Sequence, residues 1–210
     1  MKSPKPVPTV ELRTNGPYRV KDLAELIGAD GQALPVKPVV ALCRCGRSGT
    51  KPFSDGTHAK VGFSGARESL PADDVRATYV GRDITVYDNR SLCAHAGLCT
   101  DALTSVFRSG QSPWIDPDGA AADAVAAAVA ACPSGALGYA IQGRDFMEPP
   151  SVPRITVEKN GPYRVTGGVE LLNEPFRQGA SPRRYTLCRC GQSKNKPFCD
   201  GSHWDAGFEG

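Results

Sequence analysis

An internal repeat constrains this chain more than any other feature. Residues 15–65 align with residues 160–210 at a constant offset of 145, with 23 identities in 51 positions and no gap. The match predicts a duplicated module of about 55 residues, and two copies separated by a different segment are too few for a stacked solenoid. We therefore expect the two copies to pair with each other within one chain.

Each copy contains short segments that are typical of β-strands. Their residues alternate or are β-branched, and turn residues bound them, including a Gly-Pro pair after the first segment. The expected strands are residues 9–12, 18–20 and 39–42 in the first copy and residues 155–157, 163–165 and 184–187 in the second. The last strand of each copy runs directly into a group of cysteines. The pattern predicts a small β-sheet that carries a cysteine loop.

The eight cysteines are expected to be metal ligands rather than disulfide partners. Residues 1–10 lack the apolar region of a secretory signal, and no run of about 18 apolar residues is available to span a membrane. These features predict a cytoplasmic, reducing location, where closely spaced cysteines are more often metal ligands or redox groups. A formal charge of +3 is too small to indicate binding to nucleic acid or to an anionic membrane.

The second copy contains a complete set of four metal ligands. Cys188, Cys190, Cys199 and His203 fall within 16 residues, and Asp200 predicts a tight turn that starts a helix between the last two ligands. Thiolates are soft ligands that suit iron-sulfur clusters and zinc. Three cysteines and one histidine also form a common structural zinc set, so the spacing alone leaves both metals open.

The identity of the intervening residues favours iron. The segment CRCGQSKNKPFCDGSH resembles the CDGSH iron-sulfur family, whose pattern C-x-C-x2-S-x3-P-x-C-D-G-S-H it matches at every fixed position. The resemblance implies a 2Fe-2S cluster with Cys188 and Cys190 on the inner iron and Cys199 and His203 on the outer iron. Members of this family pair two modules into a β-capped dimer. The resemblance therefore implies that the tandem copies form an intramolecular pseudo-dimer in a monomeric chain.

The first copy reads CRCGRSGTKPFSDGTH and lacks one of these ligands. Cys43, Cys45 and His58 align with ligands, but Ser54 stands in the position of the third cysteine. A serine hydroxyl is far more basic than a thiol and binds metal less readily at neutral pH. Three interpretations remain: a 2Fe-2S cluster ligated by Ser54, a cluster completed by another group or water, or an empty relic kept for its fold. We favour the first, because a relic has no chemical need for the retained histidine.

The three remaining cysteines lie between the two copies. Cys93, Cys99 and Cys132 hold the first, third and fourth ligand places of a bacterial ferredoxin run, in which C-x2-C-x2-C is followed by a distant Cys-Pro. Ala96 occupies the second place. Three cysteines suit a 3Fe-4S cluster with its vacant corner beside this alanine. Alternatively, His95 completes a 4Fe-4S cluster, or it is only a neighbouring imidazole.

The secondary structure of residues 70–148 is expected to be mixed. Alternation over residues 77–87 predicts strands, and a helix is predicted from an N-cap at Asp116 to Cys132, where Pro133 ends it. The stretches CAHAGLC, SPWIDPD and CPSGAL resemble the divergent single-cluster ferredoxin domain. We therefore expect an α+β protein in which two small β-rich modules flank an inserted ferredoxin-like domain. The expected domains are residues 1–69, a CDGSH-type module with the serine substitution; residues 70–148, the ferredoxin-like domain; and residues 149–210, a CDGSH-type module.

Several cluster sites on one small chain predict an electron-transfer protein. The absence of a nucleophile, flavin or nucleotide fingerprint argues against an enzyme, and histidine ligands predict that reduction depends on pH. The main alternative is an iron-sulfur cluster carrier or a sensor of iron or redox state; a zinc-stabilised interaction module is a third reading. The expected partners are redox proteins or apo-protein cluster acceptors, without nucleic acid or membrane.

Overall fold

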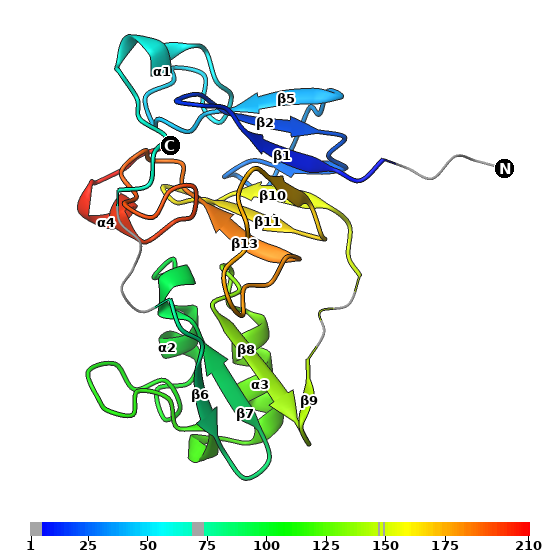
Figure 1. The fold of residues 1–210 in the computed structure, drawn as a ribbon, viewed down its shortest axis with the longest axis vertical. Helices are drawn as coiled ribbons and strands as arrows, with labels where there is room; N and C mark the ends of the chain where they lie inside the picture. Colours follow the sequence, from blue (N-terminus) through cyan, green and yellow to red (C-terminus); the bar gives the residue numbers. More distant parts are fainter. Residues whose placement is uncertain (1–5, 69–73, 147, 149) are drawn as a thin grey trace, which may run out of the picture.

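The computed structural model describes residues 6–68, 74–146, 148 and 150–210, in which strands and short helices combine in an α+β fold (Figure 1). The strands are β1 (Thr9–Leu12), β2 (Tyr18–Lys21), β3 (Glu25–Ile27), β4 (Ala33–Leu34), β5 (Val39–Leu42), β6 (Ala77–Val80), β7 (Thr85–Asp88), β8 (Leu137–Ile141), β9 (Arg144–Asp145), β10 (Arg154–Val157), β11 (Tyr163–Thr166), β12 (Glu170–Leu172) and β13 (Arg184–Leu187). The helices are α1 (Thr57–Lys60), α2 (Leu98–Ala102), α3 (Ala122–Ala130) and α4 (Ser202–Asp205), with 3-10 turns η1 (Arg90–Leu92) and η2 (Pro117–Gly119).

The two copies form neighbouring sheets, and each sheet contains a strand of the other copy. One sheet has the order β12-β1-β2-β5, with β12 of the second copy parallel to β1. The other has the order β13-β11-β10-β3-β4, with β3 of the first copy parallel to β10. Both exchanged strands have only three residues, and the sequence patterns did not predict them. Separating the copies would leave β1 and β10 with unpaired backbone edges, so the exchange holds the two copies together.

The two sheets share one hydrophobic core. Val10 and Ile155, at equivalent positions of the two copies, are fully buried in it, as are Tyr18 and Tyr163. The two tyrosine rings meet edge to face, with centroids 6.0 Å apart, an arrangement that the charge distribution of aromatic rings favours. Burying one valine or isoleucine contributes about 1.5–3 kcal/mol. Because side chains of both copies supply this core, each copy depends on the other for its stability.

A third sheet, with the order β6-β7-β8-β9, lies below the other two in Figure 1. Its hairpin β6–β7 covers the predicted strand region and extends one residue beyond it, and α3 packs against β8. The side chains of Val125, Val129 and Cys132 are buried together in the core of this segment. The cysteines of this segment adjoin a second hydrophobic core, which is separate from the first.

The predicted helix start at Asp116 is wrong. Asp116 does act as a cap, because its side chain accepts from the Asp118 N–H, but it caps η2 rather than a long helix. Ala120 is extended (φ −154°, ψ 174°) and separates η2 from α3. Gly119 packs so closely on Ser105 that a Cβ would lie 2.3 Å from the Ser105 carbonyl oxygen. This contact with another loop holds the extended segment between η2 and α3, which the alanine-rich sequence does not indicate.

No helix among the described residues is long and apolar enough to cross a membrane. The domain boundaries expected at residues 69 and 70 and at residue 149 involve positions outside the described residues, and they stay predictions.

Candidate metal centres

The four predicted ligands of the second copy lie at the end of β13 in two close pairs. The Sγ atoms of Cys188 and Cys190 are 3.8 Å apart, and Cys199 Sγ lies 3.5 Å from His203 Nδ1. All four side chains are buried. The pairs come from the two ends of a loop that folds back, because the Cys188 N–H donates to Pro197 O at 2.8 Å. Two close pairs match the ligation of a two-iron cluster, in which each iron takes two protein ligands.

Local hydrogen bonds and burial set the protonation of these ligands. Hydrogen bonds from the Cys188 thiol and from the Gln192 N–H, whose nitrogen lies 3.4 Å from Cys190 Sγ, lower the pKa of Cys190 to about 7. The same pairing of thiols, together with burial, raises the pKa of Cys188. Burial raises the pKa of Cys199 to about 12 and lowers that of His203. The imidazole is therefore held in its neutral form, the form that binds metal.

Asp200 shapes the turn between the last two ligands. Its carboxylate accepts hydrogen bonds from the Ser202 N–H at 3.0 Å and from the Lys194 N–H at 2.8 Å. Burial alone would raise the pKa of Asp200, but these hydrogen bonds lower it below its usual value. Asp200 thus stabilises the start of α4, although the N-cap position itself is Gly201 with a φ of 88°. The prediction of a turn that starts a helix here is confirmed.

The first copy repeats this geometry with serine in place of one cysteine. Cys43 Sγ and Cys45 Sγ are 3.7 Å apart, and Ser54 Oγ lies 3.5 Å from His58 Nδ1. Asp55 plays the part of Asp200, accepting from the Thr57 and Gly49 N–H groups. Ser54 and His58 are only half-buried, unlike Cys199 and His203. The site is thus formed in outline, but its outer pair is more open to solvent.

Each copy anchors the cysteine loop of the other through a buried tyrosine, a feature that the sequence analysis missed. Tyr18 Oη donates to Cys188 O at 2.8 Å and lies 3.1 Å from Pro197 O. Tyr163 Oη makes the equivalent bonds to Cys43 O (2.8 Å) and Pro52 O (3.0 Å). Burial raises the pKa of both tyrosines, so they remain donors. Both belong to the run NGPYRV that the copies share, which was the available signal.

The two cysteine loops also contact each other directly. A Cβ on Gly46 would lie 2.4 Å from Cys190 O, and a Cβ on Gly191 would lie 2.7 Å from Cys45 O. Both glycines have positive φ, 75° and 80°. Only glycine permits this approach, so the identical Cys-Arg-Cys-Gly runs bring the inner cysteines of the two copies together.

The structure also brings the three cysteines of the middle segment together. Cys93, Cys99 and Cys132 adjoin the same hydrophobic core, between η1, α2 and the end of α3. Burial raises the pKa of Cys93 and Cys99, and the charge of Cys132 raises both further. The His95 N–H lies 3.4 Å from Cys93 Sγ, and the side chain of His95 is exposed. All three histidines of the chain therefore lie in cysteine loops.

These ligand sets fit iron-sulfur clusters. Among the described residues, no three His, Cys, Asp or Glu side chains converge closely enough to hold a single metal ion. The outer copies instead offer ligands in separated pairs. Soft thiolates on loops of a small α+β fold, with backbone N–H groups facing the sulfurs of Cys93 and Cys190, are typical of iron-sulfur proteins.

Comparisons with known proteins agree with this class. The model described as "Iron-binding zinc finger CDGSH type" matches residues 15–59 and 160–204, and "Divergent 4Fe-4S mono-cluster" matches residues 79–142. Every predicted ligand falls within these ranges. The chain therefore belongs to the CDGSH iron-sulfur family and carries a divergent 4Fe-4S domain between its two CDGSH copies.

Two curated relatives carry no assigned function. "Uncharacterized protein YjdI" of Escherichia coli (strain K12) is 39% identical over 61 residues, which are 29% of this chain and 80% of YjdI. YjdI of Escherichia coli O157:H7 gives the same values. No solved structure matches the chain.

Proposed function

We propose that this iron-sulfur protein transfers single electrons and does not transform a substrate. The observation that carries the proposal is the direct contact between the inner cysteine loops, Gly46 against Cys190 and Gly191 against Cys45. Clusters held by these loops supply one-electron redox chemistry. Buried hydrogen bonds hold both cysteine loops in fixed positions. A site whose geometry changes little when it gains or loses an electron favours electron transfer.

The two CDGSH copies act, in this proposal, as an intramolecular pseudo-dimer. Three features support it: the exchange of β3 and β12 between sheets, the shared core, and the reciprocal tyrosine bonds. The middle segment is then an inserted ferredoxin-like domain.

The cluster types follow from the ligand sets. We propose a 2Fe-2S cluster held by Cys188, Cys190, Cys199 and His203, and a second one held by the equivalent set that includes Ser54. The three cysteines of the middle segment suit a 3Fe-4S cluster, whereas the family description names 4Fe-4S. Electron paramagnetic resonance (EPR) of the anaerobically purified protein, with iron and sulfide analysis, separates these two cluster types.

Incubation with an apo-ferredoxin tests the function. If the protein is a relay, repeated reduction and reoxidation in this mixture are expected to leave its own iron content constant and the apo-ferredoxin colourless. Transfer of iron and sulfide to the apo-ferredoxin would refute the proposal. Potentiometric titration at several pH values adds a second check, because histidine ligation is expected to make the potential of at least one CDGSH site depend on pH.

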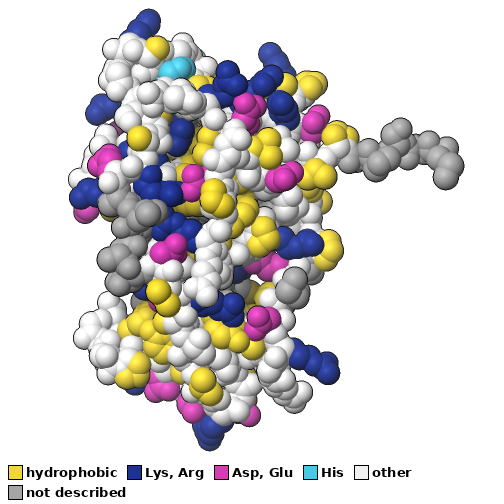
Figure 2. Space-filling model, in the orientation of Figure 1, with side chains coloured by type: hydrophobic (Ala, Val, Ile, Leu, Met, Phe, Trp, Pro, Cys, Tyr) yellow, Lys and Arg dark blue, Asp and Glu magenta, His cyan; other side chains and the backbone are white. Residues whose placement is uncertain are grey.

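Cluster donation is the second candidate function, and the open first site favours it. Ser54 is a weaker ligand than cysteine, and Ser54 and His58 are half-buried. The exposed side chains of Arg47, Lys51 and Lys60 belong to the same module, and Figure 2 shows basic side chains over the upper part of the molecule. We propose that redox proteins, or acceptor apo-proteins in this alternative, approach this module in a reducing, cytoplasmic setting.

A further inference from the structure

The loop of the middle site touches the loop of the C-terminal site. His95 has a positive φ of 52° and projects toward Gly201, which lies between two ligands of the C-terminal site. A Cβ on Gly201 would lie 3.1 Å from His95 Cβ and 3.2 Å from His95 Cδ2. The imidazole therefore packs directly on the backbone of this ligand loop.

A cavity beside this contact is lined by both loops. Its volume is about 260 Å³, and its lining includes Ala94 and Ala96 of the middle loop together with His203 and Trp204 of the C-terminal copy. The histidine ligand of the C-terminal site thus lies on the side that faces the middle domain.

A buried hydrogen bond fixes the spacing of the same two loops. The Asn195 side-chain amide donates to Ser91 O at 2.7 Å, and Ser91 lies two residues before Cys93. Arg177 donates to Asn195 Oδ1 at 2.7 Å, and its guanidinium lies 3.8 Å from Asp74 of the middle segment. Breaking these bonds would leave buried polar groups unpaired, which is costly. The two loops are therefore clamped rather than loosely apposed.

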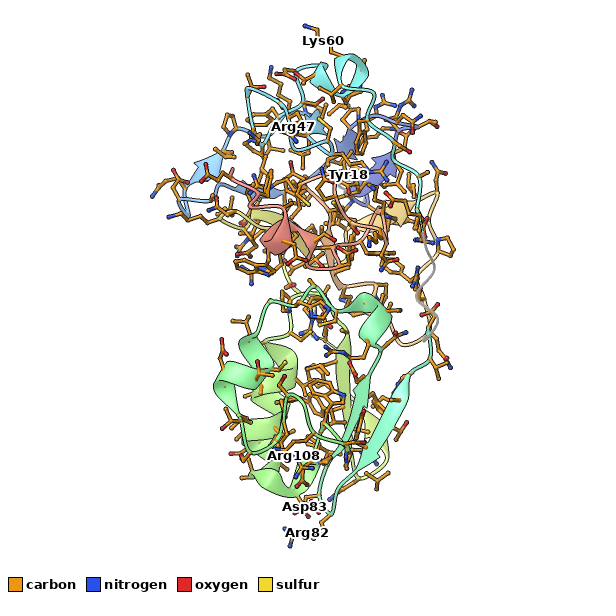
Figure 3. The ribbon with its side chains drawn as sticks, turned by 90° about the vertical axis from the view of Figure 1, so that its left-hand side faces the viewer. Tyr18, Arg47, Lys60, Arg82, Asp83 and Arg108 are labelled. Atoms are coloured by element: carbon orange, nitrogen blue, oxygen red, sulfur yellow. The ribbon has the colours of Figure 1, made fainter. Side chains whose placement is uncertain are left out.

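The equivalent positions of the first copy make no such contacts. A Cβ on Gly56, which corresponds to Gly201, would meet nothing within 4 Å. Thr50, which corresponds to Asn195, uses its hydroxyl within its own loop, 3.2 Å from Ser48 Oγ. In Figure 1, α4 faces the middle domain and α1 lies at the opposite end of the molecule. Figure 3 likewise places Lys60 far from Arg82 and Asp83 of the middle domain.

We propose that the contact between His95 and Gly201 is the route by which electrons pass between the middle site and the C-terminal site, and that the site containing Ser54 has no direct exchange with the middle site. The proposal rests on the proposed electron-transfer function and orders its sites. In each transfer one site loses an electron and the other gains it, no bond forms or breaks, and an external one-electron reductant supplies the electron. The role of the His95 side chain is to place covalently bonded atoms, rather than a gap, between the middle loop and the Gly201 loop along the path of the electron.

The test uses the whole, cluster-loaded protein with the substitution His95→Gly. Glycine tolerates the positive φ, so the change removes the imidazole with little backbone strain. Photoreduction followed by freeze-quench EPR measures how fast electrons equilibrate between the middle and C-terminal signals. We expect at least a several-fold slower equilibration, with iron content and both midpoint potentials unchanged. His95→Asn, whose side chain also tolerates positive φ, is expected to restore part of the rate.

Gln142→Gly is the matched control. Gln142 has a φ of 51° and lies exposed at the turn between β8 and β9, away from both loops. It is expected to leave the rate unchanged. An unchanged rate in His95→Gly would overturn the proposal. So would loss of iron from the middle site, because His95 would then be a ligand.

The unaltered protein provides an independent readout. When the sites are reduced, magnetic interaction with the middle site is expected to broaden the C-terminal EPR signal and not the signal of the Ser54 site. Broadening confined to the Ser54 site would refute the proposed order. These outcomes are separable from failure of the proposed function, because cluster donation to an apo-ferredoxin would refute the relay while leaving the magnetic interaction intact.

Discussion

Replacing the buried tyrosines tests whether each copy anchors the cysteine loop of the other. Tyr18→Phe keeps the ring in the core and removes only the hydroxyl that donates to Cys188 O at 2.8 Å and also faces Pro197 O. Because the tyrosine is almost fully buried, water cannot replace the bond. A buried acceptor left unpaired costs about 1–3 kcal/mol, so the free energy of unfolding is expected to fall by about this amount.

Each substitution is also expected to change the EPR signal of the other copy. Tyr18 belongs to the first copy, yet removal of its hydroxyl is expected to change the EPR signal of the C-terminal site. Tyr163→Phe is expected to change the signal of the site that contains Ser54, since Tyr163 Oη donates to Cys43 O. The two signals are distinguishable because one ligand set contains Ser54 and the other Cys199.

Tyr185→Phe is the matched control for both substitutions. Its hydroxyl is equally buried and donates to Val169 O at 2.8 Å, but this bond lies within one copy. Urea unfolding is expected to show a similar loss of stability, while both EPR signals stay unchanged. If Tyr18→Phe alters only the signal of its own copy, or neither tyrosine alters a signal more than the control does, the cross-copy anchoring is wrong.

Three further predictions concern the serine site, the turn glycines and a buried acid. Ser54→Cys is expected to leave iron per chain unchanged while shifting the visible spectrum, whereas a rise in iron would show that the site had been empty. Gly201→Ala and Gly56→Ala both force alanine into a left-handed turn (φ 88° and 90°), but only the alanine at position 201 meets His95. The urea midpoint of Gly201→Ala is therefore expected to be lower than that of Gly56→Ala, and adding His95→Gly to Gly201→Ala is expected to remove the difference. Asp88 is buried, and this burial raises its pKa to about 6 against the opposing effects of Arg90 and Trp114. Because the unfolded carboxyl has a pKa of about 3.9, the folded state binds the proton more tightly, and the free energy of unfolding is expected to fall by about 1–1.5 kcal/mol between about pH 5 and pH 8. Asp88→Asn is expected to abolish that fall, measured by urea unfolding at several pH values. An unchanged dependence of the free energy of unfolding on pH would contradict the prediction.

Local sequence patterns were sufficient to predict the three four-residue strands of each CDGSH copy and the turn at Asp200. The expected strand at residues 9–12 matches β1, and Asp200 forms the predicted turn, because alternation and turn chemistry act over a few residues. The helix start at Asp116 failed for the opposite reason. The break at Gly119 depends on Ser105, which belongs to a different loop, and no periodicity within the alanine-rich run reports a contact of that kind.

The sequence patterns did not predict how the sites are arranged relative to one another, because long-range contacts determine that arrangement. The exchange of β3 and β12 pairs residues more than 100 positions apart, and each strand is too short to show a period. His95 was singled out for its closeness to Cys93 in the chain, as a ligand or a neighbouring imidazole. The fold adds a different neighbour, Gly201. The duplicated loops are nearly identical in sequence, but only one of them faces the middle domain. The asymmetry between the two copies therefore arises from what packs on each loop as well as from the substitution of one ligand.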